Sequence, residues 1–267
     1  MTLPIRNGRI RLPQGQIFWR EVGQGIPIVL LHGTWGDGGD WLAVVDELSD
    51  YYHCLVPDLL GFGDSERPRR HYSVGLEVEC LADWLEALKL RRVYLVGVGI
   101  GAWVAAGFAL RHEDAVQGLV LLAPEGVKVA GADRRWRGGR SLLSPIPLAR
   151  WLLSLLMPVA KLLGWRGMLA LRQRVNLWRR SPAASQILFN RRPVEIQSDL
   201  VGDRLPWLKP PLLLLQGEAD DDLIAAQIRA YTDAPRAKVQ ALPGQDLLQT
   251  APEAVAQSIR AFVRSDR

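Results

Sequence analysis

Hydrophobic and polar positions alternate along the chain in a pattern that predicts buried strands separated by helices. Six runs of mostly apolar residues predict strands: 27–34, 53–60, 93–99, 118–126, 210–217 and 237–244. Between them, residues 73–90 and 100–113 have the spacing of apolar residues expected for helices. Strands that are hydrophobic almost throughout are typical of a parallel sheet covered on both faces, so the pattern predicts an α/β fold.

Two segments depart from this alternation. Residues 8–23, GRIRLPQGQIFWREVG, predict an antiparallel hairpin at the edge of the sheet. Almost ninety residues between Ala123 and Pro211 have no strand pattern and are rich in Leu, Arg and Trp. We therefore expect a core of residues 1–123 and 208–267 and an inserted helical subdomain at 124–207.

Composition places the chain among ordinary globular proteins and indicates no metal centre. Of its 267 residues, 48% are hydrophobic and 23% are charged, which excludes a largely disordered chain. Cys54 and Cys80 form no CxxC motif and no cluster with histidine, so both are expected to be core residues in a reducing compartment. The first sixteen residues contain no apolar signal region, and we expect a cytoplasmic protein.

Four motifs follow predicted strands in a fixed order, and each ends a different strand. They are LHGTWGDGGDW (31–41), PDLLGFGDSERP (57–68), LVGVGIGAWVA (95–105) and QGEADDDL (216–223). Together they resemble the α/β-hydrolase fold family over residues 8–264. The resemblance implies a mostly parallel central sheet with helices on both faces, and a cap over the active site formed by the insertion.

The positions that carry catalysis in that family hold different residues here. The nucleophile turn G-x-S-x-G corresponds to residues 97–101, GVGIG, with Gly99 at the nucleophile. Gln245 stands at the position of the catalytic histidine and has no pKa near neutrality. Asp220 matches the catalytic acid, with Asp221 and Asp222 as alternatives in register, and we expect a carboxylate that binds backbone amides. The resemblance therefore implies a hydrolase fold without its nucleophile and base.

Backbone donors of the site are expected to remain. The resemblance assigns oxyanion-type N–H groups to Ile100 and to Thr34 or Trp35, beside a loop shaped by His32. Such donors could bind a carbonyl, a carboxylate or another anion, so the site can hold a ligand without cleaving it. The other histidines, His53, His71 and His112, are expected at the surface, and none is a replacement base.

Two alternatives give this region a different chemistry. Glu125 follows a strand at the entrance to the insertion and is a candidate acid or water-activating base for an atypical hydrolase or lyase. Residues 97–102 also match the dinucleotide fingerprint G-x-G-x-x-A, with Glu125 near the position of a ribose-binding acid. The dinucleotide alternative leaves the other three motifs unexplained.

Charge is unevenly distributed along the chain. Residues 134–192 contain thirteen Arg and Lys and no Asp or Glu, so this segment carries +13 in a chain of net charge +5 and the remainder carries −8. Residues 134–180 combine cations with Leu and Trp, as interfacial helices do, although the longest uncharged run is too short to span a bilayer. Candidates for contact with an anionic membrane are Arg134, Arg135, Trp136, Arg137, Arg140, Trp151 and Trp165; the segment also contains Trp178. A solvated cationic cap is the alternative, and nucleic acid is a weaker one.

Taken together, the sequence predicts a non-hydrolytic protein of the α/β-hydrolase fold without cofactor or metal. Its expected ligand is an apolar small molecule held under the cap. Its expected partner is an anionic membrane surface or a membrane protein complex, which would make it peripheral on the membrane.

Overall fold

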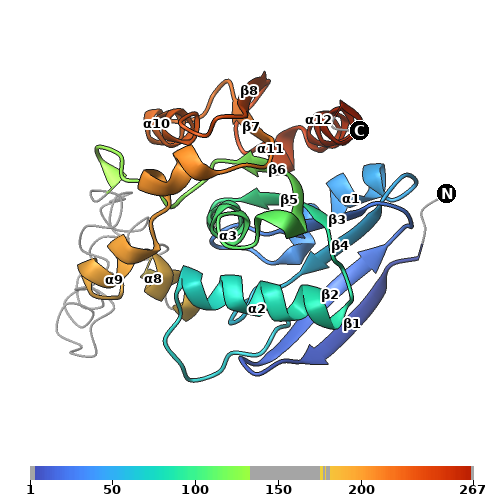
Figure 1. Cartoon of the computed structure of the whole chain (residues 1–267), viewed down its shortest axis with the longest axis horizontal. Coiled ribbons are helices and arrows are strands. Elements are labelled where there is room, and N and C mark those ends of the chain that lie inside the picture. Colours follow the sequence, from blue (N-terminus) through green and yellow to red (C-terminus); the bar gives the residue numbers. More distant parts are fainter. Residues whose placement is uncertain (1–3, 133–174, 177, 179–180, 266–267) are drawn as a thin grey trace, which may run out of the picture.

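A computed structural model of the chain describes residues 4–132, 175, 176, 178 and 181–265 (Figure 1). Its centre is one eight-stranded sheet with the order β1-β2-β4-β3-β5-β6-β7-β8. The strands are β1 (Arg6–Arg11), β2 (Gln16–Val22), β3 (Pro27–Leu31), β4 (His53–Pro57), β5 (Val93–Val98), β6 (Val116–Leu122), β7 (Leu212–Gly217) and β8 (Ala237–Leu242). β1 and β2 pair antiparallel to their neighbours, and the six strands from β4 to β8 run parallel. The predicted edge hairpin and parallel sheet are confirmed.

Helices cover both faces of this sheet, as Figure 1 shows. On one face lie α2 (Val74–Ala87), α3 (Ile100–Ala109) and α10 (Asp222–Tyr231), whose apolar residues share one core cluster. On the other face, η1 (Gly38–Trp41), α1 (Leu42–Leu48), α11 (Leu247–Thr250) and α12 (Pro252–Ser265) share a second cluster. The α/β-hydrolase-like fold class predicted from the sequence is therefore observed.

Elements end where local backbone conformation requires it. The apolar run 118–126 predicted a longer strand, but β6 ends at Leu122 because Ala123 has a positive φ of 40° and Pro124 follows. Similarly, α2 begins after the Ser73 cap and ends at Ala87, just before Lys89 at a φ of 57°. β5 and β6 pair in parallel up to Val98 and Leu122, so their carboxyl ends lie beside each other.

The described residues between β6 and β7 form helices and no strand. They include α8 (Pro182–Leu188), α9 (Pro193–Asp199) and η3 (Gly202–Trp207), and η2 (Glu113–Ala115) precedes β6. In Figure 1, α8 and α9 lie beside the amino-terminal end of α2. None of the helices in the described part of the chain has the length and apolar character needed to cross a membrane.

Candidate ligand site at the Gly99 turn

Gly99 forms the turn between β5 and α3. Its φ of 57° and ψ of −118° lie in a region that a residue with a side chain adopts at a cost of about 1–3 kcal/mol. Its backbone is fixed on both sides, because its N–H donates to the Leu122 carbonyl at 3.1 Å and its carbonyl accepts from Trp103 at 3.2 Å. The turn therefore has the strained strand-to-helix geometry of a nucleophile elbow with no side chain at its apex.

The flanking glycines allow α3 to start directly against the sheet. A Cβ on Gly97 would lie 2.6 Å from the Ala102 amide nitrogen, and one on Gly101 would lie 2.5 Å from the His32 carbonyl and closer still to that of Leu31. Such distances leave no room for any side chain. Close packing accounts for Gly97 and Gly101 and the positive φ accounts for Gly99, so the dinucleotide fingerprint is not needed to explain these glycines.

Thr34 lies against the apex of this turn. A Cβ built on Gly99 would lie 3.0 Å from the Thr34 hydroxyl oxygen and 3.5 Å from its backbone nitrogen. The backbone N–H groups of Thr34 and of Ile100, the first residue of α3, thus flank the position of a nucleophile. The buried Thr34 hydroxyl donates to Oε1 of Glu125 at 3.3 Å.

Glu125 is joined to the same turn through its backbone. Its N–H donates to the Gly99 carbonyl at 3.3 Å, and its own carbonyl accepts from the Tyr231 hydroxyl at 2.6 Å. The Glu125 side chain is half-buried. The structure therefore brings together Gly99, Thr34, Ile100 and Glu125, which the sequence had named from two motifs and one strand end.

His32 supports the loop that carries Thr34. Its Nε2 accepts from the Leu59 amide at 3.0 Å, and Nδ1 lies 2.8 Å from the Gly33 carbonyl, to which it donates. Complete burial lowers the pKa of this imidazole, so it stays neutral. Both ring nitrogens are engaged with backbone, so His32 holds the shape of this loop.

Asp58 is a scaffold residue that the sequence analysis did not single out. Its buried carboxylate accepts from the amides of Gly38 at 2.7 Å and Asp64 at 2.8 Å, and Arg20 lies 3.1 Å away. It ties the loop after β3 to the loop after β4. The only signal in the sequence was its place in the PDLLGFGDS motif.

Asp220 and Gln245 lie in adjacent loops. The Asp220 carboxylate accepts from the Gly217 amide at 2.8 Å, which confirms the expected backbone-binding role. The Ala219 amide donates to the Gly244 carbonyl at 3.0 Å and so joins this loop to the residue before Gln245, whose side chain is exposed. Asp221 caps α10 by accepting from Ile224 at 2.8 Å.

The remaining histidines lie elsewhere. His53 begins β4 and lies 3.9 Å from Glu21, and His71 is exposed beside Glu195 at 3.2 Å. His112 stacks on Phe108 after α3. As the sequence predicted, these three side chains sit away from the Gly99 turn.

Carboxylates give the strand-end loops a negative character. Burial is the largest cause of a raised pKa at Asp40, and neighbouring Asp37 and Asp246 add to it. Burial also raises the pKa of Asp220, with further contributions from Asp221 and Asp246. Such surroundings disfavour a ligand with a negative charge at this end and favour a neutral one.

Apolar side chains of the insertion pack near the Thr34 loop. Val175, Trp178 and Phe189 form a buried cluster against which Trp35 and Leu188 pack. Trp178 is only 4% exposed and meets the Phe189 ring edge-on at 5.3 Å. Trp178 is therefore an internal residue of the insertion and not part of an exposed surface.

The other residues proposed for a membrane surface, Arg134 to Arg140, Trp151 and Trp165, lie outside the described residues. One cation of the basic segment is accounted for. Arg191 is buried and pairs with Asp199 at 2.6 Å. It is therefore an internal ion pair and contributes nothing to a basic surface.

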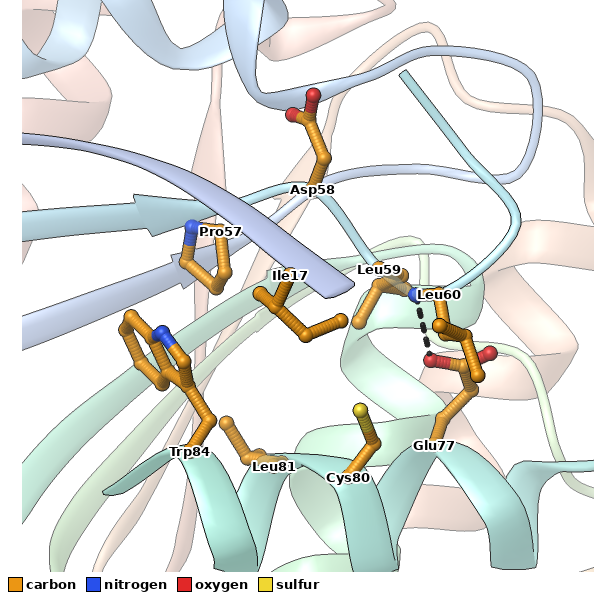
Figure 2. A pocket seen from close by; sticks show the side chains of 9 residues that line it. All are labelled: Ile17, Pro57, Asp58, Leu59, Leu60, Glu77, Cys80, Leu81 and Trp84. Atoms are coloured by element: carbon orange, nitrogen blue, oxygen red, sulfur yellow. Dashed lines mark hydrogen bonds between the residues drawn. The ribbon is translucent and has the colours of Figure 1, made fainter. Parts of the chain in front are cut away.

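A second feature lies under the neighbouring loop. A cavity of about 20 Å³ lies between α2, β2 and the loop that follows β4. Figure 2 shows the side chains that line it, which are mostly apolar and include Glu77 and Cys80. It is large enough for about one water molecule. The Glu77 carboxyl, 1% exposed, accepts from the Leu60 amide at 3.0 Å, and burial raises its pKa to about 8. This cavity does not accommodate an acyl ligand.

Cys54 and Cys80 are free and buried, as predicted.

An elbow after β5 of a mostly parallel sheet and a helical insertion after β6 are the features of a hydrolase-type α/β protein. The sequence profile of the Alpha/beta hydrolase family matches residues 28–258, and the chain belongs to this family.

Similar proteins fall into several activity classes. The chain is 40% identical over 124 residues to 2-hydroxy-6-oxo-2,4-heptadienoate hydrolase of Pseudomonas putida, covering 43% of this chain and 45% of that one. It is 33% identical over 132 residues to 1-acylglycerol-3-phosphate O-acyltransferase ABHD5 of Sus scrofa, covering 45% and 37%. The chain thus spans less than half the length of these curated relatives.

Solved structures match over almost the whole chain. A membrane phospholipase A, described as a bacterial virulence factor, superposes with a TM-score of 0.76 at 27% identity, covering 98% of this chain and 87% of that one. A haloalkane dehalogenase variant from Bradyrhizobium elkanii superposes with a TM-score of 0.73 at 20% identity, covering 98% and 97%. The second likeness shows the fold alone.

Proposed function

We propose that this protein binds a neutral acyl ester or similar apolar molecule at the Gly99 turn and does not hydrolyse it through an acyl-enzyme. One observation carries the proposal. The elbow is present in full backbone detail, yet its apex residue has no side chain. A covalent acyl intermediate requires a nucleophilic atom at that position and a base beside it.

Binding groups remain where the nucleophile is missing. Backbone N–H groups of Thr34 and Ile100 suit the carbonyl oxygen of an ester. The apolar cluster that includes Trp35 supports an apolar ligand, and the carboxylates of the nearby loops favour a neutral one. Relatives named for phospholipid and acylglycerol phosphate chemistry support an acyl ligand.

A fluorescent neutral acylglycerol is expected to bind the purified chain and to be displaced by an unlabelled acylglycerol. Trp35→Ala should weaken binding about tenfold because it removes an apolar contact beside the Thr34 loop. Trp207→Ala is the matched control, since Trp207 is 71% exposed at the end of η3. Fluorescence titration measures both constants. Equal loss in the two variants, or no binding by the wild type, would refute the proposal.

A second candidate is an atypical hydrolase or lyase in which Glu125 activates water. The specific observation in its favour is the Thr34–Glu125 hydrogen bond, 3.3 Å long, at the position of the nucleophile. A carboxylate held there can accept a proton from a water near a bound carbonyl. Slow ester turnover without a burst, lost in Glu125→Gln, would distinguish this candidate.

Attachment to an anionic membrane remains part of the proposal for residues 134–180. The acid-free, cationic and Leu-rich composition of this segment supports it. In this account the acyl ligand would be taken from the membrane surface.

A further inference from the structure

A groove of about 440 Å³ lies between the loop that precedes α2 and the start of α8. Its walls are Gly61, residues 67–72, Pro182, Ala183 and Gln186. Arg67, Arg69 and Arg70 all line it, and each is exposed. The groove uses none of the residues at the Gly99 turn and none of residues 134–180, so it is a separate candidate site.

The positive charge of this groove is not balanced within the described part of the chain. No carboxylate described there lies within 4 Å of Arg67, Arg69 or Arg70. The nearby Glu66 already pairs with Arg11 at 2.6 Å. Three like charges within four residues repel one another, so an anion bound between them would relieve an unfavourable arrangement.

Nearby acidic and dipolar groups are also accounted for. Glu195 at the rim lies 3.2 Å from His71. Backbone amides at the amino terminus of α2 are already engaged, because Ser73 accepts from Leu76 and Asp199 accepts from Val74 at 3.2 Å. A ligand in the groove would therefore meet the three arginines, with the Glu195 carboxylate at the rim beside His71.

Loop and helix hold the groove in shape. The Tyr72 hydroxyl donates to the Pro68 carbonyl at 3.0 Å, and the Tyr72 amide donates to the Gln186 side-chain oxygen at 3.0 Å. The latter bond fixes the arginine loop to α8. The side-chain NH₂ group of Gln186 is not used in this bond and can donate to an anion.

We propose that this groove binds a phosphate group, presented by an anionic lipid headgroup. Guanidinium groups match the oxygens of phosphate through paired hydrogen bonds, and three of them match a multiply charged oxyanion better than a single carboxylate. The adjoining α9 carries Val194, next to Glu195. The apolar side chain of Val194 is 75% exposed and is available to contact a lipid surface. A soluble phosphate ester shares the chemistry and is separated from the lipid by experiment.

The test uses the full chain and two charge-matched variants. Arg69→Gln with Arg70→Gln alters the groove and leaves Arg67, which donates to the Gly63 carbonyl. Arg91→Gln with Arg92→Gln is the control. These exposed arginines follow the opposite end of α2, a helix of 14 residues and thus about 20 Å long. Both variants lose two positive charges from exposed loops.

Flotation with phosphatidylcholine vesicles containing phosphatidic acid is expected to show binding that pure phosphatidylcholine does not support. The groove variant should bind about thirtyfold more weakly and the control variant within about twofold of wild type. Equal weakening of both variants would assign the effect to overall charge and overturn the proposal.

Calorimetry with glycerol 3-phosphate identifies the source of the phosphate. Binding of this ester that is lost in the groove variant, without vesicle binding, would retain the phosphate site and overturn the lipid as its source. A single-stranded oligonucleotide that binds through Arg69 and Arg70, while phosphatidic acid and glycerol 3-phosphate do not, would contradict the proposal.

Discussion

Gly101→Ala is expected to lower the free energy of unfolding by at least about 3 kcal/mol. The new Cβ would lie 2.5 Å from the His32 carbonyl oxygen and nearer still to that of Leu31. Both are backbone atoms at the end of β3 and cannot move aside as a flexible side chain can. Alanine favours a helix over glycine by about 0.5–1 kcal/mol. Because the steric clash costs more than this, the substitution is expected to be destabilising.

Urea unfolding monitored by circular dichroism measures this change, and Gly202→Ala is the matched control. A Cβ at Gly202 meets nothing nearer than 3.9 Å, the distance to Cγ1 of Val127. That variant should remain within about 0.5 kcal/mol of wild type. A Gly101→Ala protein as stable as the control would mean that α3 does not start against β3 as described.

Glu77→Gln is expected to remove a pH dependence of stability. Burial raises the pKa of Glu77 from an ordinary 4.5 to about 8. Between these values the folded protein keeps the proton and the unfolded chain releases it. The contribution of Glu77 to the free energy of unfolding is therefore fully present below pH 4.5. It falls by about 1.4 kcal/mol per pH unit as pH rises and is lost once pH exceeds about 8.

The difference in unfolding free energy between wild type and Glu77→Gln should accordingly fall by about 4 kcal/mol from about pH 5 to about pH 8. Glutamine retains an oxygen that can accept from the Leu60 amide, so the hydrogen bond is kept while the titration is removed. Glu79→Gln, an exposed position on the same helix, is the control and should follow wild type. Parallel profiles for wild type and Glu77→Gln would refute a buried, protonated Glu77.

The strands and the turn glycines were predictable because their signals are local. Runs such as VYLVGV are buried on both faces of the sheet, and so they are hydrophobic throughout. Gly97, Gly99 and Gly101 are spaced by the turn itself, which needs one positive φ and two close backbone approaches.

The contacts that define the site were not predictable, because they join residues far apart in sequence. Thr34 and Glu125 are 91 positions apart and meet only because β3, β5 and β6 are neighbours in the sheet. In sequence, Glu77 resembles an exposed acidic residue of a helix. Its burial depends on the loop that contains Leu60, whose amide donates to the Glu77 carboxyl. Trp178 lies in the same Trp-rich and Leu-rich segment as the membrane candidates, and its burial depends on contact with Phe189.

The arginine groove has the same origin. The sequence RPRR at residues 67–70 has the composition of a solvated loop. The loop alone gives no reason to expect a concave site. Its second wall comes from α8, more than a hundred residues later, through the bond from Tyr72 to Gln186.

The central claim is that the Gly99 turn binds without forming a covalent intermediate, and intact-protein mass spectrometry after treatment with a fluorophosphonate tests it most directly. Wild type should gain no mass, because the turn offers no nucleophile to phosphorus. Gly99→Ser with Gln245→His should gain one probe, which shows that the turn presents its apex residue to the reagent. One probe added to the wild-type chain, located on a peptide that lines the Gly99 turn, would contradict the account.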